Sequence, residues 1–253
     1  MPGVVLTRNE GWAQITLDRP EKRNALSLAM WRALPGLVAQ CADDPAVRLL
    51  ALRGVGGVFS GGADLEEFET AYAQAPEAAH AVIKAGMEAV AACPKPTVAV
   101  IEGFAVGAGL GLAVACDMRV AVDGARFAVP PARLGLLYSF GDLARLVALI
   151  GPARAKLLLY TARRVDTATA LAWGLIEEAA APADLEETFT RLRTDLLRAA
   201  PSTVSACKRL FSLIASGQRE ETPETLALFA DAFRGDAFKE GLAAFRERRA
   251  PRF

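Results

Sequence analysis

The 253-residue chain has a single histidine, His80, and this scarcity excludes several kinds of site. A metal centre built on imidazoles needs more than one histidine, and any Ser/His/Asp triad would depend on His80 alone. Cysteine is also sparse, with no CxxC pair and no Cys/His cluster among Cys41, Cys93, Cys116 and Cys207. Such spacing is typical of buried thiols in a reducing compartment. We therefore expect no metal site and no disulfide.

The chain lacks net charge as well, because 29 Lys and Arg balance 29 Asp and Glu. A neutral chain has no bulk attraction for nucleic acid or for an anionic membrane. The longest uncharged stretch, Gly103–Cys116, is too short to span a bilayer, and no signal peptide is visible before Trp12. We expect a cytoplasmic protein that binds neither nucleic acid nor membrane. Mean hydropathy of +0.25 favours burial of surface between subunits.

Hydrophobic periodicity divides the chain into two parts. Continuous apolar runs at Val47–Arg53 and Thr97–Ile101 predict buried strands, and strands alternate with helical patterns to about residue 180. That alternation is typical of an α/β architecture. After Asp184 only helical patterns remain. We predict an α/β core over residues 1–195 and a helical region over residues 196–253.

Two glycine-rich turns are the candidate chemical features. Phe59–Asp64 and Gly103–Gly111 both follow predicted buried strands and precede helical patterns. Glycine lets a ligand approach the backbone, and amides at a helix start lack intrahelical partners. Two such turns facing each other would hold a developing negative oxygen between two N–H donors. Each turn alone is equally typical of a tight strand–helix contact. Neither turn matches the complete GxGxxG or P-loop pattern.

Seven segments form an ordered set of motifs that covers most of the chain: Asp18–Leu26, Phe59–Leu65, Lys95–Gly109, Ala115–Asp117, Gly151–Lys156, Ala170–Ile176 and Glu240–Arg249. This ordered set resembles the crotonase (enoyl-CoA hydratase/isomerase) superfamily. The resemblance implies a crotonase/ClpP-like spiral of ββα units, with C-terminal helices that assemble trimers or hexamers made of two trimers. It also implies an acyl-CoA thioester as substrate, with coenzyme A arriving as part of that substrate and no separate cofactor.

The same resemblance assigns site residues. The oxyanion hole of the family falls on the backbone N–H groups of Ala63 and Ala108, which would bind the thioester oxygen and stabilise its enolate. A further set matches the coenzyme A groove, in which Arg23 would either pair with a phosphate or remain a solvated surface residue. This set comprises Arg23, Asn24, Ala25, Leu26, Gly61, Asp64, Leu65 and Gly107.

Two departures from the family pattern argue against standard hydration. Family hydratases carry two glutamates, whose positions here hold Gly111 and Pro131. Neither residue transfers a proton, whereas water addition needs positioned carboxylates. Loss of the second glutamate also weakens the double-bond isomerase interpretation, because that position usually supplies the isomerase base.

The segment that follows Pro131 holds the remaining candidates. Its sequence up to Tyr138 is similar to the corresponding segment of methylmalonyl-CoA decarboxylases. The match is partial, because those decarboxylases have His where this chain has Ala63. Tyr138 would orient a leaving carboxylate or simply pack in the loop, and Asp142 would act in catalysis or begin the next helix. We predict an acyl-CoA-transforming lyase or isomerase; the alternative is a non-catalytic acyl-CoA-binding protein. Acyl chain, reaction type and pathway stay open.

Overall fold

The computed structural model describes residues 3–253 and is built around a six-stranded sheet, in the order β1-β2-β3-β4-β6-β9. The first pair is an antiparallel hairpin and every later pairing is parallel. A second sheet of three strands has the order β5-β7-β8. The strands are β1 Val4–Asn9, β2 Trp12–Leu17, β3 Leu50–Gly54, β4 Thr97–Ile101, β5 Phe104–Val106, β6 Met118–Val122, β7 Arg126–Ala128, β8 Arg164–Asp166 and β9 Glu178–Ala180.

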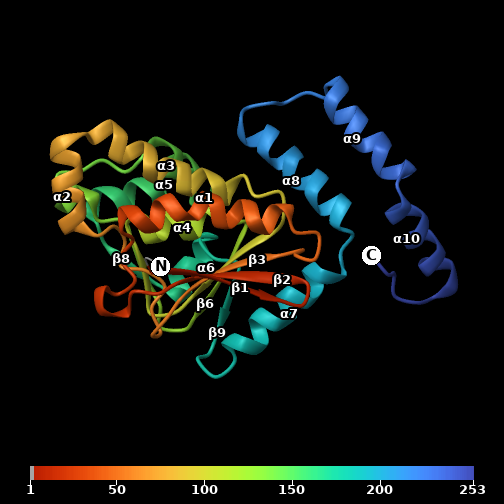
Figure 1. Cartoon of the computed structure of the whole chain (residues 1–253), viewed down its shortest axis with the longest axis horizontal. Helices are drawn as coiled ribbons and strands as arrows, with labels where there is room; N and C mark the ends of the chain where they lie inside the picture. Colours follow the sequence, from red (N-terminus) through yellow and green to blue (C-terminus); the bar gives the residue numbers. More distant parts are fainter. Residues whose placement is uncertain (1–2) are drawn as a thin grey trace.

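Helices cover both faces of the larger sheet (Figure 1). Short 3-10 helices span Pro20–Lys22 and Pro131–Arg133. The α-helices are α1 Leu28–Asp43, α2 Leu65–Gln74, α3 Pro76–Ala91, α4 Ala108–Ala115, α5 Phe140–Thr161, α6 Thr167–Trp173, α7 Leu185–Arg198, α8 Pro201–Ala215, α9 Pro223–Arg234 and α10 Asp236–Glu247. The predicted alternation of strands and helices, followed by helices alone after residue 184, is confirmed.

Alternation along β3 and the residue before it explains why the stretch Leu49–Leu52 is continuously apolar. Leu50 and Leu52 pack into the main core, which includes buried side chains of α1, α3, α4 and α5. Leu49 and Ala51 belong to a second core that includes Leu185 of α7. Successive side chains of a strand point to opposite faces, so a sheet covered on both faces needs apolar residues at every position.

The last three helices differ from the rest because they leave much apolar surface exposed. In Figure 1, α9 and α10 stand away from the sheet, whereas α7 packs against it. Trimer formation through this region, and the division at residue 195, stay predictions. Among residues 3–253, no helix combines the length and apolarity needed to cross a bilayer. The large hydrophobic residues exposed on α8–α10 are Phe211, Ile214, Leu226, Phe229, Phe233, Phe238, Leu242 and Phe245.

Candidate active site

The first glycine-rich turn presents the amide of Ala63 by pairing its neighbours with Leu26. Leu26 N–H donates to Gly62 O at 2.7 Å, and Asp64 N–H donates to Leu26 O at 3.0 Å. Successive N–H groups of extended backbone point to opposite sides. The N–H of Ala63 is therefore directed away from Leu26, on the side left open by this pairing.

Ser60 fixes the beginning of the same turn from inside the protein. Its side chain is fully buried. Its Oγ donates to Asn24 O at 2.8 Å and accepts from Gly62 N–H at 3.1 Å. A Cβ on Gly109 would lie 2.7 Å from Ser60 Cβ, so only glycine permits this approach of α4 to the turn. The two glycine-rich segments are thus packed directly against each other.

The second turn presents the amide of Ala108 through the start of α4. Gly107 has φ +54° and ψ −121°, a conformation suited to glycine. Its N–H donates to Ala128 O at 2.9 Å, and its carbonyl accepts from Gly111 N–H at 3.0 Å. Ala108 is the first residue of α4, so its N–H has no intrahelical acceptor and lies at the positive end of the helix dipole.

The two amides lie close together. A Cβ on Gly62, the residue before Ala63, would stand 2.8 Å from Val106 O and 3.6 Å from Ala108 N. Ala63 and Ala108 are both half-buried. Within residues 3–253, neither N–H donates a hydrogen bond to a protein acceptor. The arrangement offers two adjacent, accessible main-chain donors of the kind that stabilises an oxyanion.

Asn24, one of the residues matched to the coenzyme A groove, holds the turn together instead of presenting a free side chain. It is fully buried. Its Nδ2 donates to Val55 O at 2.9 Å and to Val58 O at 2.6 Å. Its Oδ1 accepts from Arg19 N–H at 3.0 Å. The Asn24 side chain is therefore committed to the loops beside the site.

Asp64 is likewise occupied by a protein partner. It is buried, and its Oδ2 accepts from Arg19 Nη2 at 2.9 Å. Burial opposes its charge, but the hydrogen bond from Arg19 and the nearby Lys22 outweigh that effect and lower the pKa of Asp64. Asp64 thus remains ionised and anchors the start of α2.

The other residues of the predicted groove surround the turn with different exposure. Arg23 and Leu65 are exposed, whereas Leu26 is fully buried. The carbonyl of Arg23 accepts from Gly61 N–H at 2.9 Å, which brings the two segments side by side. Ala25, Gly61 and Gly107 are half-buried. Within residues 3–253, the Arg23 guanidinium forms no ion pair, so it is available to a phosphate.

The space beside Gly111, where the resemblance predicts the first family glutamate, is filled by other side chains. A Cβ on Gly111 would lie 2.9 Å from Met87 Cε, 3.0 Å from the Tyr138 hydroxyl and 3.4 Å from Asp142 Cγ. Tyr138 and Asp142, predicted from the sequence as separate candidates, thus meet at one point beside α4. The hydroxyl of Tyr138 donates to Gly107 O at 3.4 Å.

Asp142 is a buried carboxyl with two polar partners. Ser139 Oγ lies 2.6 Å from Oδ2, and Arg145 Nη1 donates to Oδ1 at 3.1 Å. Burial raises the pKa of Asp142, although these two partners oppose the shift. Burial, together with the charge of Asp142, raises the pKa of Tyr138 well above its ordinary value. The hydroxyl of Tyr138 consequently stays protonated and serves as a donor.

Sequence reasoning missed three residues that shape the site, namely Ser60, Met87 and Arg145. The position of Arg145 three residues after Asp142, where helical neighbours meet, was a usable signal. Ser60 lay within a motif already recognised, but its two hydrogen bonds depend on the distant Asn24. Nothing in the local pattern of α3 indicates that Met87 faces Gly111.

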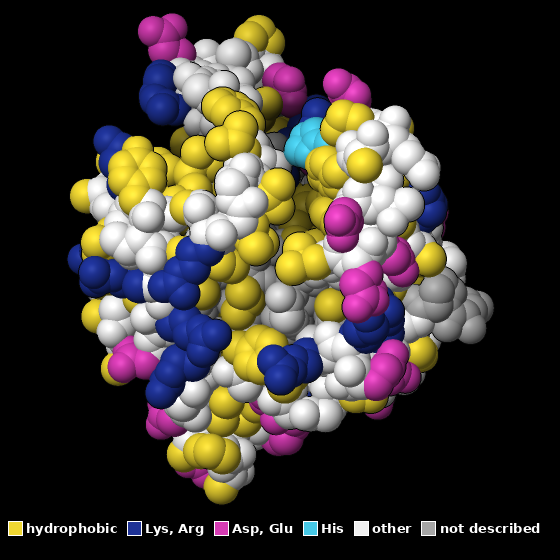
Figure 2. All heavy atoms as spheres, turned by 90° about the vertical axis from the view of Figure 1, so that its left-hand side faces the viewer, with side chains coloured by type: hydrophobic (Ala, Val, Ile, Leu, Met, Phe, Trp, Pro, Cys, Tyr) yellow, Lys and Arg dark blue, Asp and Glu magenta, His cyan; other side chains and the backbone are white. Residues whose placement is uncertain are grey.

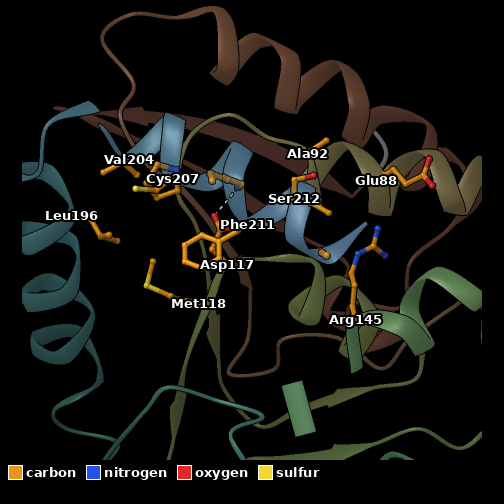
Figure 3. A pocket seen from close by; sticks show the side chains of 14 residues that line it. Glu88, Ala92, Asp117, Met118, Arg145, Leu196, Val204, Cys207, Phe211 and Ser212 are labelled. Atoms are coloured by element: carbon orange, nitrogen blue, oxygen red, sulfur yellow. Dashed lines mark hydrogen bonds and ion pairs between the residues drawn. The ribbon is translucent and has the colours of Figure 1, made fainter. Parts of the chain in front are cut away.

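The surface contains two separate hollows near these elements. Figure 2 shows the face that carries α2 hollowed, with hydrophobic side chains inside and charged ones around it. A groove of about 840 Å³ lies instead under α8, and its lining includes Phe211 and Ser212 of α8, Glu88 of α3 and Arg145 of α5 (Figure 3). Its lining includes neither Ala63 nor Ala108. Arg145 is its one link to Asp142, so the groove is distinct from the amide pair.

Comparisons with known proteins agree with this architecture. The family model for enoyl-CoA hydratase/isomerase matches residues 7–253. Enoyl-CoA hydratase domain-containing protein 2, mitochondrial, from Bos taurus is 38% identical over 97% of this chain and 85% of its own length. Crotonyl-CoA hydratase from Syntrophomonas wolfei is 32% identical, covering 99% of this chain and 97% of its own.

The solved structures give the same answer for the fold. An enoyl-CoA hydratase/isomerase family protein from Hyphomonas neptunium superposes with a TM-score of 0.95 at 39% identity, covering 99% of this chain and 97% of its own. The crotonase-type α/β fold expected from the sequence is therefore confirmed. On the family match, the relatives and the shared fold, the chain belongs to the enoyl-CoA hydratase/isomerase (crotonase) family.

Proposed function

We propose that this chain is an enzyme that transforms an acyl-CoA thioester through an enolate held between the N–H groups of Ala63 and Ala108. The observation that carries the proposal is the adjacency of two half-buried amides for which residues 3–253 provide no acceptor. As the thioester becomes an enolate, negative charge gathers on its oxygen. Donors fixed in advance by the fold stabilise that charge without reorganising, and each is worth about 3–4 kcal/mol.

The proposed chemistry is decarboxylation or isomerisation and excludes standard hydration. Gly111 and Pro131 carry no group that activates water. In a decarboxylation, the bond between the α-carbon and the carboxylate breaks, CO2 leaves, and the electron pair becomes the enolate, which is then protonated at the α-carbon. This reaction needs an oxyanion hole but no strong base. Beside Gly111, Tyr138 offers a protonated hydroxyl and Asp142 offers a carboxyl.

The binding of coenzyme A is assigned to the segment beside the first turn. Arg23 is exposed and without an ion pair inside residues 3–253, so it would meet a phosphate. Ala25, Leu65, Gly61 and Gly107 would provide the backbone and apolar contacts, whereas Leu26 is fully buried and would support this segment from inside. Asn24 and Asp64 would act by fixing this segment, because their side chains are already hydrogen-bonded.

Turnover of a small panel tests the proposal. Purified protein is assayed with crotonyl-CoA, a 3-enoyl-CoA, malonyl-CoA and methylmalonyl-CoA. We expect turnover of at least one substrate other than crotonyl-CoA, and hydration of crotonyl-CoA near background. Robust hydration would contradict the role given to Gly111 and Pro131. Tight binding of acyl-CoA without turnover of any member would favour the alternative, a protein that only binds acyl-CoA.

A further inference from the structure

Tyr138 is hydrogen-bonded to the peptide group that contains the oxyanion donor, the N–H of Ala108. The hydroxyl of Tyr138 donates to Gly107 O, and the carbon that carries this oxygen is bonded to the nitrogen of Ala108. The same oxygen accepts Gly111 N–H at 3.0 Å in the first turn of α4. The carbonyl end of this peptide is therefore held by two donors, whereas its N–H end remains open to a ligand.

Among the hydrogen bonds of residues 3–253, the Tyr138 hydroxyl donates to Gly107 O and forms none with Asp142. The Asp142 carboxylate already accepts from Ser139 Oγ and from Arg145 Nη1. Gly107 O lies 3.4 Å from the hydroxyl, longer than an average O–H···O bond. Inside a protein, the lower dielectric strengthens such a contact, and donors on a carbonyl polarise the N–H of the same peptide.

From this geometry we propose that Tyr138 is a positioning residue, which orients and polarises the Gly107–Ala108 peptide so that the Ala108 N–H is a stronger donor to the thioester oxygen. The inference rests on the proposed function of the two amides and deepens it. It differs from a role for Tyr138 at a leaving carboxylate, because its effect is exerted on the thioester carbonyl even where no reaction takes place.

Gly111 contributes to the same contact between Tyr138 and Gly107. Its missing side chain leaves the space in which the Tyr138 hydroxyl lies, since a Cβ there would approach the hydroxyl to 3.0 Å. Real Cβ atoms have few contacts this short, so a larger residue at position 111 displaces the hydroxyl or Met87. The glycine therefore permits the contact between Tyr138 and Gly107 rather than merely marking an absent glutamate.

Infrared spectroscopy of a bound thioester tests this inference without turnover. The probe is butyryl-CoA carrying ¹³C at the thioester carbonyl. In the native protein, we expect the carbonyl stretch to fall below its frequency in free butyryl-CoA. In Tyr138→Phe, the stretch should return part of the way to the free value. In Gly111→Ala, it should shift in the same direction, because the hydroxyl is displaced.

Matched controls separate this effect from general damage. Tyr160→Phe removes an exposed hydroxyl, and Gly36→Ala adds a methyl group where no atom lies within 4 Å, so both should keep the native frequency. With the substrate found in the panel above, Tyr138→Phe should lower kcat about threefold to tenfold, the value of one ordinary hydrogen bond, with KM unchanged.

The possible outcomes distinguish the inference from the proposed function. If the native protein lowers the carbonyl frequency and Tyr138→Phe lowers it equally, the positioning role is wrong but the amide pair stands. If the native protein binds butyryl-CoA without lowering its frequency, the oxyanion hole itself fails, and the role of Tyr138 fails with it.

Discussion

The two glycine-rich turns and the segment from Pro131 to Asp142 build adjoining parts of one site in different ways. In the turns, the functional groups are main-chain amides fixed by buried residues such as Ser60. In the later segment, the functional groups are side chains. The segment lies at the surface, since its residue Leu137 is 97% exposed. A main-chain donor survives most substitutions, whereas one substitution removes a side-chain group. The comparison teaches why charge stabilisation can persist while the acid or base changes.

Removing the amide at position 108 should produce the largest effect on activity. Ala108→Pro deletes the N–H, but proline is well tolerated at the first position of a helix. Loss of one oxyanion donor costs about 3–4 kcal/mol, so kcat should fall by about 10²–10³. Ala108→Gly keeps the N–H and should lose far less. Equal losses in the two variants, at equal thermal stability, would show that the donor lies elsewhere.

Adding a methyl group at position 111 should break the contact between the two regions. Gly111→Ala places Cβ 2.9 Å from Met87 Cε and 3.0 Å from the Tyr138 hydroxyl. Overpacking of this kind costs about 1–3 kcal/mol of unfolding free energy. The matched variant Gly36→Ala, in the open part of α1, should instead stabilise by about 0.5–1 kcal/mol, because alanine favours the helix. Urea unfolding of both variants measures the difference, and equal signs would contradict the assigned packing.

The pH dependence of the unfolding free energy should have opposite signs for Asp142 and Asp64. We expect this effect to be smaller than those of the substitutions at positions 108 and 111. The pKa of Asp142 is raised from 3.8, so the native state keeps this proton longer than the unfolded chain. The unfolding free energy, measured relative to Asp142→Asn, should therefore decrease as pH rises from about 3.8 through the folded pKa.

Asp64 provides the opposite case. Its pKa is lowered from 3.8 by folding. The contribution of Asp64 to the unfolding free energy, measured relative to Asp64→Asn, should therefore be complete above pH 3.8 and be lost as the pH falls through the folded pKa. Chemical denaturation of the two asparagine variants and the native chain between about pH 2 and about pH 7 provides the comparison. Parallel pH profiles for both variants would mean that Arg19 and burial do not act on these carboxyls as described.

Much of the local structure could be predicted because its cause lies close in the sequence. Ser27 is of a residue type that favours the position before a helix, and its Oγ accepts from Met30 N–H at 3.2 Å at the start of α1. Gly174 is of the type that favours the position after a helix, and it follows α6 with φ +75°. A capping side chain and its amide are neighbours along the chain, as are the residues of a C-terminal glycine cap. Such features need no knowledge of distant partners.

The candidate site could be predicted only in part. The resemblance indicated which amides to consider, but their adjacency depends on Gly62 meeting Val106 and Ala108 across the turn. The sequence also placed Asn24 in a ligand groove, whereas the structure commits its side chain to Val55 and Val58. Those partners lie about 30 residues away, and no local pattern specifies them.

By itself, the sequence determined the alternation of strands and helices to about residue 180, the helices alone after Asp184 and the absence of a proton-transferring side chain at positions 111 and 131, because each follows from residue type and local spacing. The tertiary structure alone decided that two amides converge and that Tyr138 and Asp142 occupy the space beside Gly111. The physical reason is range: hydrogen-bonding and steric preferences act between neighbours in the chain, whereas close approach between separate elements is set only when the core packs.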